Sequence, residues 1–285
     1  MPQENSIQSE LRRIIEPFLK SVLGPDFLDR LAVVRNTLAH VDWVATQKRL
    51  EELPTKSKAA MALASSKGWF FGWHESLAEL FALVDRLAVI KQSHIDEVMG
   101  QYYRDNLDAF SDELVEKHPN RATVIKAAVR AHRELGADGY FLSIPVFIAQ
   151  ADGLLAEIAG VKSAMTKAKK ENKTGELEGP KALREKLSTD QKALDLLHPV
   201  LKLHELDFMK SASAREKATR ASGEVFTALN RHRVMHGESW DYGTEINSLK
   251  AFSFLAFVGL HLPLVLDLPW RSSKVTAHDV SESLV

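Results

Sequence analysis

Apolar side chains recur along this chain with the period of an α-helix, and this pattern limits the possible folds more than any other feature. Between Ser9 and Val22, for example, the apolar residues fall on one helical stripe. β-Branched runs joined by Asn-Gly or Asp-Gly hairpin turns, which are typical of sheets, are missing. The sequence therefore predicts an all-α protein built as a helical bundle.

The same spacing, with glycine and proline as stop signals, predicts further helices along the chain. We expect them over residues 27–53, 69–90, 93–117, 120–135, 140–158, 183–206 in parts, 223–236 and 244–266. Pro54 is expected to end the first of these, Asn120 to cap the fourth, and Gly237 to close the helix 223–236. The most apolar run, 251–266, is shorter than a bilayer requires and contains His261, so we expect a buried core helix.

Composition narrows the class of protein. The chain has 285 residues, of which 45% are hydrophobic and 26% charged, as in soluble globular proteins, and no membrane association is expected. Its formal charge of -1 gives no overall attraction to nucleic acid, so a polyanion site must come from a local patch. The absence of cysteine excludes a disulfide scaffold and a thiol nucleophile. The start of the chain lacks the layout of a signal peptide, and the sequence therefore predicts a cytoplasmic protein.

Arg231 and His236, separated by four residues, are the strongest candidates for chemistry. On a helix they lie about 140° apart, so the arginine must bend back toward the imidazole, whereas His232 and His236 share a face. A histidine in the last turn is favoured as imidazolium by the helix dipole and can exchange a proton near neutral pH. Arg231 can supply a fork-shaped cation for a phosphate. These groups suit RNA cleavage without a metal, which needs acid-base catalysis and a fixed positive charge.

The residues around this pair extend the pattern. The segment Asn230-Arg231-His232, then His236-Gly237, the loop Asp241-Tyr242-Gly243-Thr244 and the run Asn247-Ser248-Leu249 resemble the C-terminal half of bacterial proteins of the HEPN superfamily, all-helical domains that bind nucleotides and cleave RNA. His232 stands where Asn or Asp is frequent in that family. The apolar helix with Gln150, Asp152 and Gly153 is similar to the family's other inward-facing helix.

The resemblance implies a function, a site and partners. It implies a metal-independent endoribonuclease in which Arg231 and His236 are catalytic, supported by Asn230, His232, Asp241 and Tyr242. One histidine does not readily act as both base and acid, and HEPN ribonucleases pair two such helices across a homodimer. We therefore expect RNA as substrate and a homodimer. A toxin or phage-defence role, with an antitoxin or defence-system partner, is also implied.

The helical pattern and the resemblance together predict how the chain is divided. We expect an added N-terminal helical region over 1–118, a HEPN-like bundle over 120–268 with a basic insertion at 161–182, and a flexible tail over 269–285. Within the earlier turns of the helix 223–236, Val225, Phe226 and Leu229 are candidates to pack at or beneath a dimer contact.

Basic side chains near the site are candidates for binding the RNA backbone. They are Lys162, Lys167, Lys169, Lys170 and Arg233. The lysine cluster can also be a solvated helix face, because glutamates follow it closely. The aromatic run 69–73 could stack on bases, but apolar positions on a helix are more often core.

Other interpretations of the Arg231–His236 segment remain open. The arginine and the histidines can form a solvated helix face, with His236 contacting the last carbonyl groups. His232 and His236 could instead bind zinc with Glu238 and Asp241, although we expect no metal and no cofactor. The alternative function is a non-catalytic helical module that binds a nucleotide or a protein.

A second Arg-to-His pair with the same spacing lies near the start of the chain. Arg35 is followed by Asn36, and His40 comes five residues after Arg35. This pair could indicate a divergent second HEPN-like unit within one chain, or it could arise by chance because the motif is short.

Overall fold

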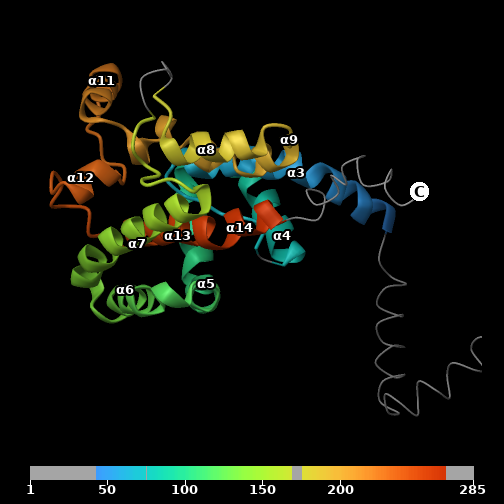
Figure 1. Cartoon of the computed structure of the whole chain (residues 1–285), viewed down its shortest axis with the longest axis horizontal. Helices are drawn as coiled ribbons and strands as arrows, with labels where there is room; N and C mark the ends of the chain where they lie inside the picture. Colours follow the sequence, from blue (N-terminus) through green and yellow to red (C-terminus); the bar gives the residue numbers. More distant parts are fainter. Residues whose placement is uncertain (1–42, 75, 169–174, 268–285) are drawn as a thin grey trace, which may run out of the picture. The chain divides into compact units, whose positions relative to one another are not determined.

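The computed structural model describes residues 43–74, 76–168 and 175–267, and Figure 1 shows that these fold into helices. No strand occurs in this part of the chain, where only an isolated bridge links Lys167 to Leu177. The prediction of an all-α protein is confirmed. The expected helix 9–22, the pair Arg35 and His40, and the expected tail 269–285 lie outside the described residues.

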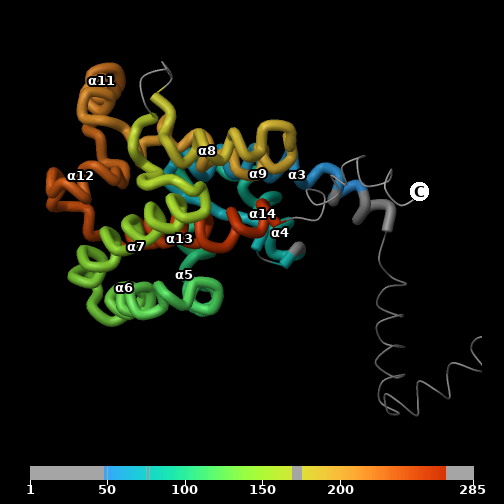
Figure 2. Tube along the Cα trace, viewed as in Figure 1, coloured from blue at the N-terminus to red at the C-terminus, as the bar shows by residue number. Residues whose placement is uncertain are grey.

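Twelve α-helices are defined along the described residues, and the path of the chain through them can be followed in Figure 2. The longer ones in the first part are α3 (Trp43–Ser66), α4 (Leu77–Val89), α5 (Ile95–Lys117), α6 (Ala122–Glu134) and α7 (Gly136–Ala159). They are followed by α8 (Glu178–Leu187), α9 (Gln191–Leu196), α10 (His198–Leu201), α11 (Ala212–Ser222), α12 (Arg231–Met235), α13 (Glu245–Ala256) and α14 (Leu262–Asp267). A π-helical turn, Phe257–His261, joins α13 to α14.

The chain divides into two compact units, residues 1–52 and 53–285, and the packing described below is that of the second unit. Its centre is α13, which packs against α5 and α7, while α6 packs against both α5 and α7. Every residue from Ser248 to Leu262 is buried. The expected helix over 244–266 is therefore present as α13, the π-helical turn and α14, with Thr244 capping its start.

The buried polar groups of α13 are satisfied by neighbouring helices. Ser248 Oγ lies 2.8 Å from His132 Nδ1 on α6 and 2.8 Å from Ser143 Oγ on α7. Lys250 Nζ pairs with Asp96 at 2.9 Å at the start of α5. Because an unpaired buried polar group costs about 1–3 kcal/mol, these contacts fix how the helices around α13 are placed.

The aromatic run 69–71 is not helical, contrary to the helix expected over 69–90. α4 begins only at Leu77, because the Ser76 side chain caps it by accepting from the Glu79 N–H. The backbone before it is held by side chains of the core: the Phe70 N–H donates to Ser253 Oγ at 3.2 Å, and its carbonyl accepts from the Tyr103 hydroxyl. The rings of this segment are buried, so the interpretation as core rather than as a base-stacking surface agrees with the structure.

Two expected helix boundaries also differ. Pro54 lies inside α3 and does not end a helix there. Buried apolar side chains continue at helical spacing on both sides of it, including Leu53 and Met61, and their burial outweighs the hydrogen bond that a proline removes. Asn120 makes no capping hydrogen bond, because Pro119–Arg121 forms a 3-10 turn and α6 starts at Ala122.

Two helical stretches in the described part of the chain are long and apolar enough to cross a bilayer by length and composition alone. They are Gly136–Ala159 and Glu245–Asp267. In the second, 78% of the most apolar window is buried inside the protein, as expected for a core helix. The first lies with 44% of its window buried and packs against α6 and α13.

His261, in the π-helical turn, is a buried titratable group. Its Nδ1 accepts from the Trp73 N–H at 3.0 Å, and its Nε2 lies 3.2 Å from the Leu196 carbonyl oxygen, so a neutral ring with its proton on Nε2 satisfies both contacts. Burial lowers the pKa of His261 from its ordinary 6.5 to about 4.

This depressed pKa predicts a pH dependence of stability. The unfolded chain binds a proton to His261 below pH 6.5, whereas the folded protein does not until about pH 4, so stability is lost as the pH falls through this window. We expect the free energy of unfolding to fall by roughly 1.4 kcal/mol per pH unit from this group. Urea unfolding of the wild type and of His261→Gln between pH 7.5 and 5.5 measures this dependence. If the free energy of unfolding changes with pH equally in the two proteins, His261 is not its source.

Candidate functional site

The helix that carries Arg231 is much shorter than the helix expected over 223–236. Gly223 has a φ of 74°, and this left-handed residue ends α11 instead of starting a helix. α12 begins only after Asn230, whose side chain caps it by accepting from the Arg233 N–H. Arg231 is therefore in the first turn of α12, and His236 is its C-cap. Gly237 follows with a φ of 70°, so the expectation that it closes the helix is confirmed.

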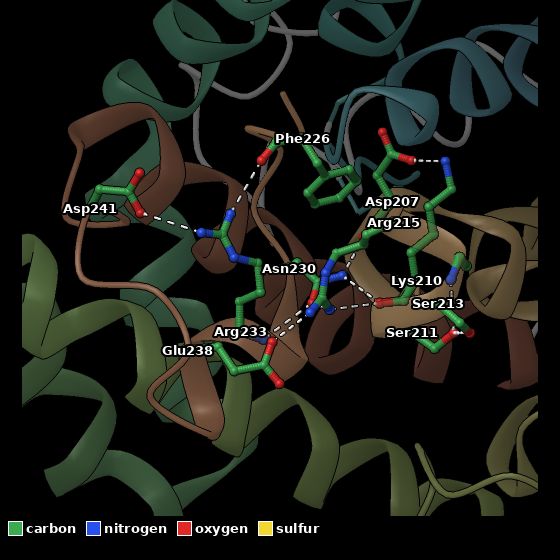
Figure 3. A network of polar contacts seen from close by, with 11 residues as sticks. Asp207, Lys210, Ser211, Ser213, Arg215, Phe226, Asn230, Arg233, Glu238 and Asp241 are labelled. Atoms are coloured by element: carbon green, nitrogen blue, oxygen red, sulfur yellow. Dashed lines mark hydrogen bonds and ion pairs between the residues drawn. The ribbon is translucent and has the colours of Figure 1, made fainter. Parts of the chain in front are cut away.

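Asn230 fixes the position of α12 through four hydrogen bonds, shown in Figure 3. Its Nδ2 donates to the carbonyl oxygens of Asp207 at 2.7 Å and Lys210 at 3.0 Å. Its Oδ1 accepts from the Arg233 N–H at 3.2 Å and from Arg215 Nη1 at 3.0 Å. The side chain is buried, so all its polar capacity is used within the protein. The structure thus gives this expected supporting residue the geometry of a helix cap.

Arg233, a candidate for RNA binding, is directed at groups of the protein itself. Its Nη1 donates to the Phe226 carbonyl at 3.2 Å, and its Nη2 lies 3.8 Å from Asp241 Oδ1 (Figure 3). The Ser239 hydroxyl, followed by the Arg233 guanidinium, holds the pKa of Asp241 below its usual range. Arg233 and Asp241 therefore shape the loop after α12.

Tyr242, another of the expected supporting residues, connects this loop to α7. Its hydroxyl donates to the Phe141 carbonyl at 3.2 Å, and the two rings meet edge to face with centroids 5.0 Å apart. The Tyr242 carbonyl in turn accepts from Asn247 Nδ2 at 3.0 Å. Through these contacts Tyr242 positions the chain between α12 and α13.

Arg231 reaches α7, where its Nη2 donates to Asp152 Oδ2 at 3.0 Å. Both side chains are about one-fifth exposed. The contact uses one atom of each group, because Arg231 Nε and Asp152 Oδ1 are buried without a hydrogen-bond partner among the described residues. A two-pronged pair, the stronger geometry for arginine and carboxylate, is therefore only half formed.

His232 and His236 stack on one another, with ring centroids 5.9 Å apart and planes 9° from parallel. This is the shared face expected for residues four apart. Burial, followed by the positive charge of Arg231 and the nearby His236, lowers the pKa of His232. The lowered pKa favours the neutral form of His232. His236 is exposed at the end of the helix.

The zinc alternative finds no support in this arrangement. Glu238 pairs with Arg215 at 2.5 Å, and Asp241 faces Arg233, so both carboxylates are directed at guanidinium groups. Among the described residues no cluster of three or more His, Cys, Asp or Glu side chains could hold a metal ion.

A cavity of about 280 Å³ opens between α7, the turn that follows it and α12. Arg231, Asp152 and Lys162 all line it. His232 and His236 are not among its lining residues: at about 100° per residue, His232 lies about 100° and the C-cap His236 about 140° around the axis of α12 from Arg231. The cavity thus joins the candidate arginine to one of the expected basic residues and leaves the histidines beside its edge.

The remaining expected basic residues are spread out. Lys167 is exposed beside the isolated bridge to Leu177, away from the lining of this cavity. Lys169 and Lys170 lie outside the described residues. Among the basic candidates that are described, Lys162 alone lines the same cavity as Arg231.

The partner of Arg231 is the contact that sequence reasoning missed. Asp152 is one of the few charged residues on an otherwise apolar helix, which signalled an inward-facing polar group. Its pairing with a residue 79 positions later depends on the folded packing of α7 against α12. Arg215, which holds both Asn230 and Glu238, gave no comparable signal, because it lies in a short run of small and basic residues.

Replacing Asn230 by alanine should loosen α12 without unfolding the core. The change removes a cap and one of the donors to each of the Asp207 and Lys210 carbonyl oxygens, so we expect a loss of about 1–2 kcal/mol. Hydrogen exchange should increase in peptides spanning 207–241 and remain unchanged in α13. Asn120→Ala, an exposed residue without a capping contact, is the control. Unchanged exchange around α12 would contradict this role.

Comparisons with known proteins found no relative of this chain. No family model, no curated protein and no solved structure matches the chain. The functional argument therefore depends on the residues and contacts described above.

Proposed function

We propose that this chain is a metal-independent endoribonuclease of the HEPN type. In such a reaction a base takes the proton of the 2′-hydroxyl, an acid protonates the leaving oxygen, and a fixed cation stabilises the charge that builds on the phosphate. His236 supplies proton transfer and Arg231 the cation. His232, kept neutral by burial, lies against His236 and supports its orientation.

The observation that best supports this proposal is the arrangement of α12 at the cavity. Arg231 lies at the wall of a space large enough for a ligand, and the stacked histidines occupy the adjoining strip of the same short helix. Asp152 holds the guanidinium through one hydrogen bond from Nη2, which leaves Nη1 as a donor for an anion, whereas Nε is buried.

Two copies of the chain are required to form one catalytic site, because a single His236 does not readily act as both base and acid in one step. Of the three residues expected at the contact, Leu229 is buried in the core of one chain and Phe226 is half-buried in the loop before α12. Val225 is 80% exposed and can contribute to a contact between copies. Cytoplasmic location and a toxin or defence role with a protein partner belong to the same proposal.

One observation favours a second candidate, a non-catalytic module that binds a nucleotide or a protein. Arg231 and Asp152 form an ion pair that is largely buried, and such a pair can serve to position α12 on α7. In that case the charge of Arg231 is compensated within the chain.

Purified protein incubated with single-stranded RNA in EDTA should produce defined cleavage products, and His236→Ala should abolish them. The fold should be retained, because His236 is exposed at the end of α12 and contributes little core area. His94→Ala, an exposed histidine at the start of α5, should cleave like the wild type. Gel analysis with circular dichroism as the folding control measures both. Equal activity in the wild type and His236→Ala would refute the proposal.

Arg231→Lys separates charge from geometry. Lysine keeps the positive charge but not the planar fork, so we expect most of the cleavage activity to be lost while the thermal midpoint changes little. Asp152→Asn, which keeps the volume of the side chain, should lower kcat because it releases the guanidinium. If both variants lower only the thermal midpoint and leave RNA cleavage intact, the pair is structural and Arg231 is not the catalytic cation.

A further inference from the structure

A second cavity, of about 380 Å³, lies where the end of α5 meets the start of α6 and the middle of α7. The polar side chains that carry the argument below are Lys117, His118, Arg121, Gln150 and Glu157. They differ from the residues that line the cavity beside α12, so what this cavity binds does not depend on the proposed function. Its volume is near the lower end of the range of roughly 300–1,000 Å³ that is typical of small-ligand sites.

Arg121 organises the wall that α7 contributes to this cavity. Its Nη1 donates to Gln150 Oε1 at 2.7 Å, and its Nη2 pairs with Glu157, two turns further along α7. The guanidinium lies against Gly153, where a Cβ atom would be 3.0 Å from Nη1 and 3.1 Å from Nη2. The side chain of Arg121 is only 19% exposed. Arg121 is therefore held in one place by groups of α7, and the glycine makes room for it.

The contacts of Gln150 and His118 determine which atoms each offers to the cavity. A guanidinium only donates, so Gln150 presents its oxygen to Arg121, and its Nε2 remains as a donor without a partner among the described residues. His118 Nε2 lies 2.9 Å from the Gly259 carbonyl oxygen, which only accepts, so Nε2 carries a proton. In the neutral ring, His118 Nδ1 then offers a lone pair.

The charges of the lining favour a ligand with a single negative charge. Lys117 and Arg121 are cations and Glu157 is an anion, so positive charge exceeds negative charge by one when His118 is neutral. Lys117 pairs with Glu113 at 2.6 Å, but both side chains are partly exposed, and such surface pairs contribute little. The ammonium of Lys117 is thus available to a ligand.

The available donors suit a carboxylate better than a phosphate. Both Nη atoms of Arg121 already donate within the protein, so the open guanidinium fork that favours phosphate is missing from the described lining. One ammonium and one amide remain, which match the two oxygens of a carboxylate. His118 Nδ1 adds an acceptor, which matches a hydroxyl group on the same ligand.

We propose that this cavity binds a small hydroxy acid with one carboxylate. The carboxylate lies between Lys117 and Gln150 Nε2, and the hydroxyl group donates to His118 Nδ1. Arg121 does not contact the ligand and acts as a positioning residue, because it orients the Gln150 amide. Lys117 and Gln150 belong to different helices, so the bound acid bridges α5 and α7.

Calorimetry of the full chain with L-lactate, propionate and inorganic phosphate tests the class of ligand. Propionate has the carbon skeleton of lactate without the hydroxyl group, so it should bind more weakly than lactate, and phosphate more weakly still. Lactate should also raise the thermal midpoint, because it binds only the folded protein. The proposal is overturned if lactate does not bind, or if propionate or phosphate binds as tightly as lactate.

Two variants test the placement of the carboxylate. Gln150→Glu keeps an acceptor for Arg121 but replaces the amide donor by a negative charge, so lactate binding should weaken by about tenfold or more while the fold is retained. Lys117→Gln should weaken it to a similar extent. Lys126→Gln, an exposed lysine of α6 outside the lining, is the matched control and should bind like the wild type. Equal lactate binding by Lys117→Gln and Lys126→Gln, or wild-type binding by Gln150→Glu, would overturn the site.

Discussion

The structure of residues 53–267 depends on the burial of one continuous helical segment, Ser248 to Leu262. Every side chain in it is buried, so each of its polar groups needs a partner within the protein. Ser248 finds His132 and Ser143, and His261 bridges the backbone at Trp73 and Leu196. These contacts bring α5, α6, α7 and the non-helical aromatic run to fixed places around α13, because any other placement would leave a buried polar group unpaired.

The candidate site, unlike the core, is held mainly by polar contacts. α12 has five residues and buries only Val234, so apolar burial alone cannot hold it. It is held by hydrogen bonds from Asn230 and by ion pairs, among them Arg231 with Asp152. An apolar helix that packs on the core, α7, thus forms one wall of the cavity, and α12, which buries one side chain, forms the other. We expect α12 to open locally at a lower free energy than the core helices.

Sequence periodicity was sufficient for the helices whose signals are local. α5 begins two residues after the start of the helix expected over 93–117, and α7 includes the whole of the helix expected over 140–158 but begins four residues earlier, at Gly136. Periodicity failed where a contact between residues far apart in the sequence determines the local backbone conformation. The run 69–71 is as apolar as a buried helix, yet it is not helical, and Tyr103 and Ser253 bind its backbone at Phe70. In the candidate site, the segment with Arg231 was recognised from its neighbours in sequence, whereas Asp152 could be joined to it only by packing, since 79 residues separate them.

The amide of Asn230 has a chemical consequence for the lifetime of the protein. Asparagine and aspartate are nearly equivalent as helix caps, since both offer a side-chain oxygen to the first turn. At this position they are not equivalent, because the other end of the amide donates to two carbonyl oxygens, and a carboxylate would present an oxygen to them instead. Deamidation during ageing or storage would thus turn two attractive contacts into repulsive ones inside a buried site. A deamidated preparation would therefore lose the structure of its α12 region while its helical core still looks intact by bulk spectroscopy.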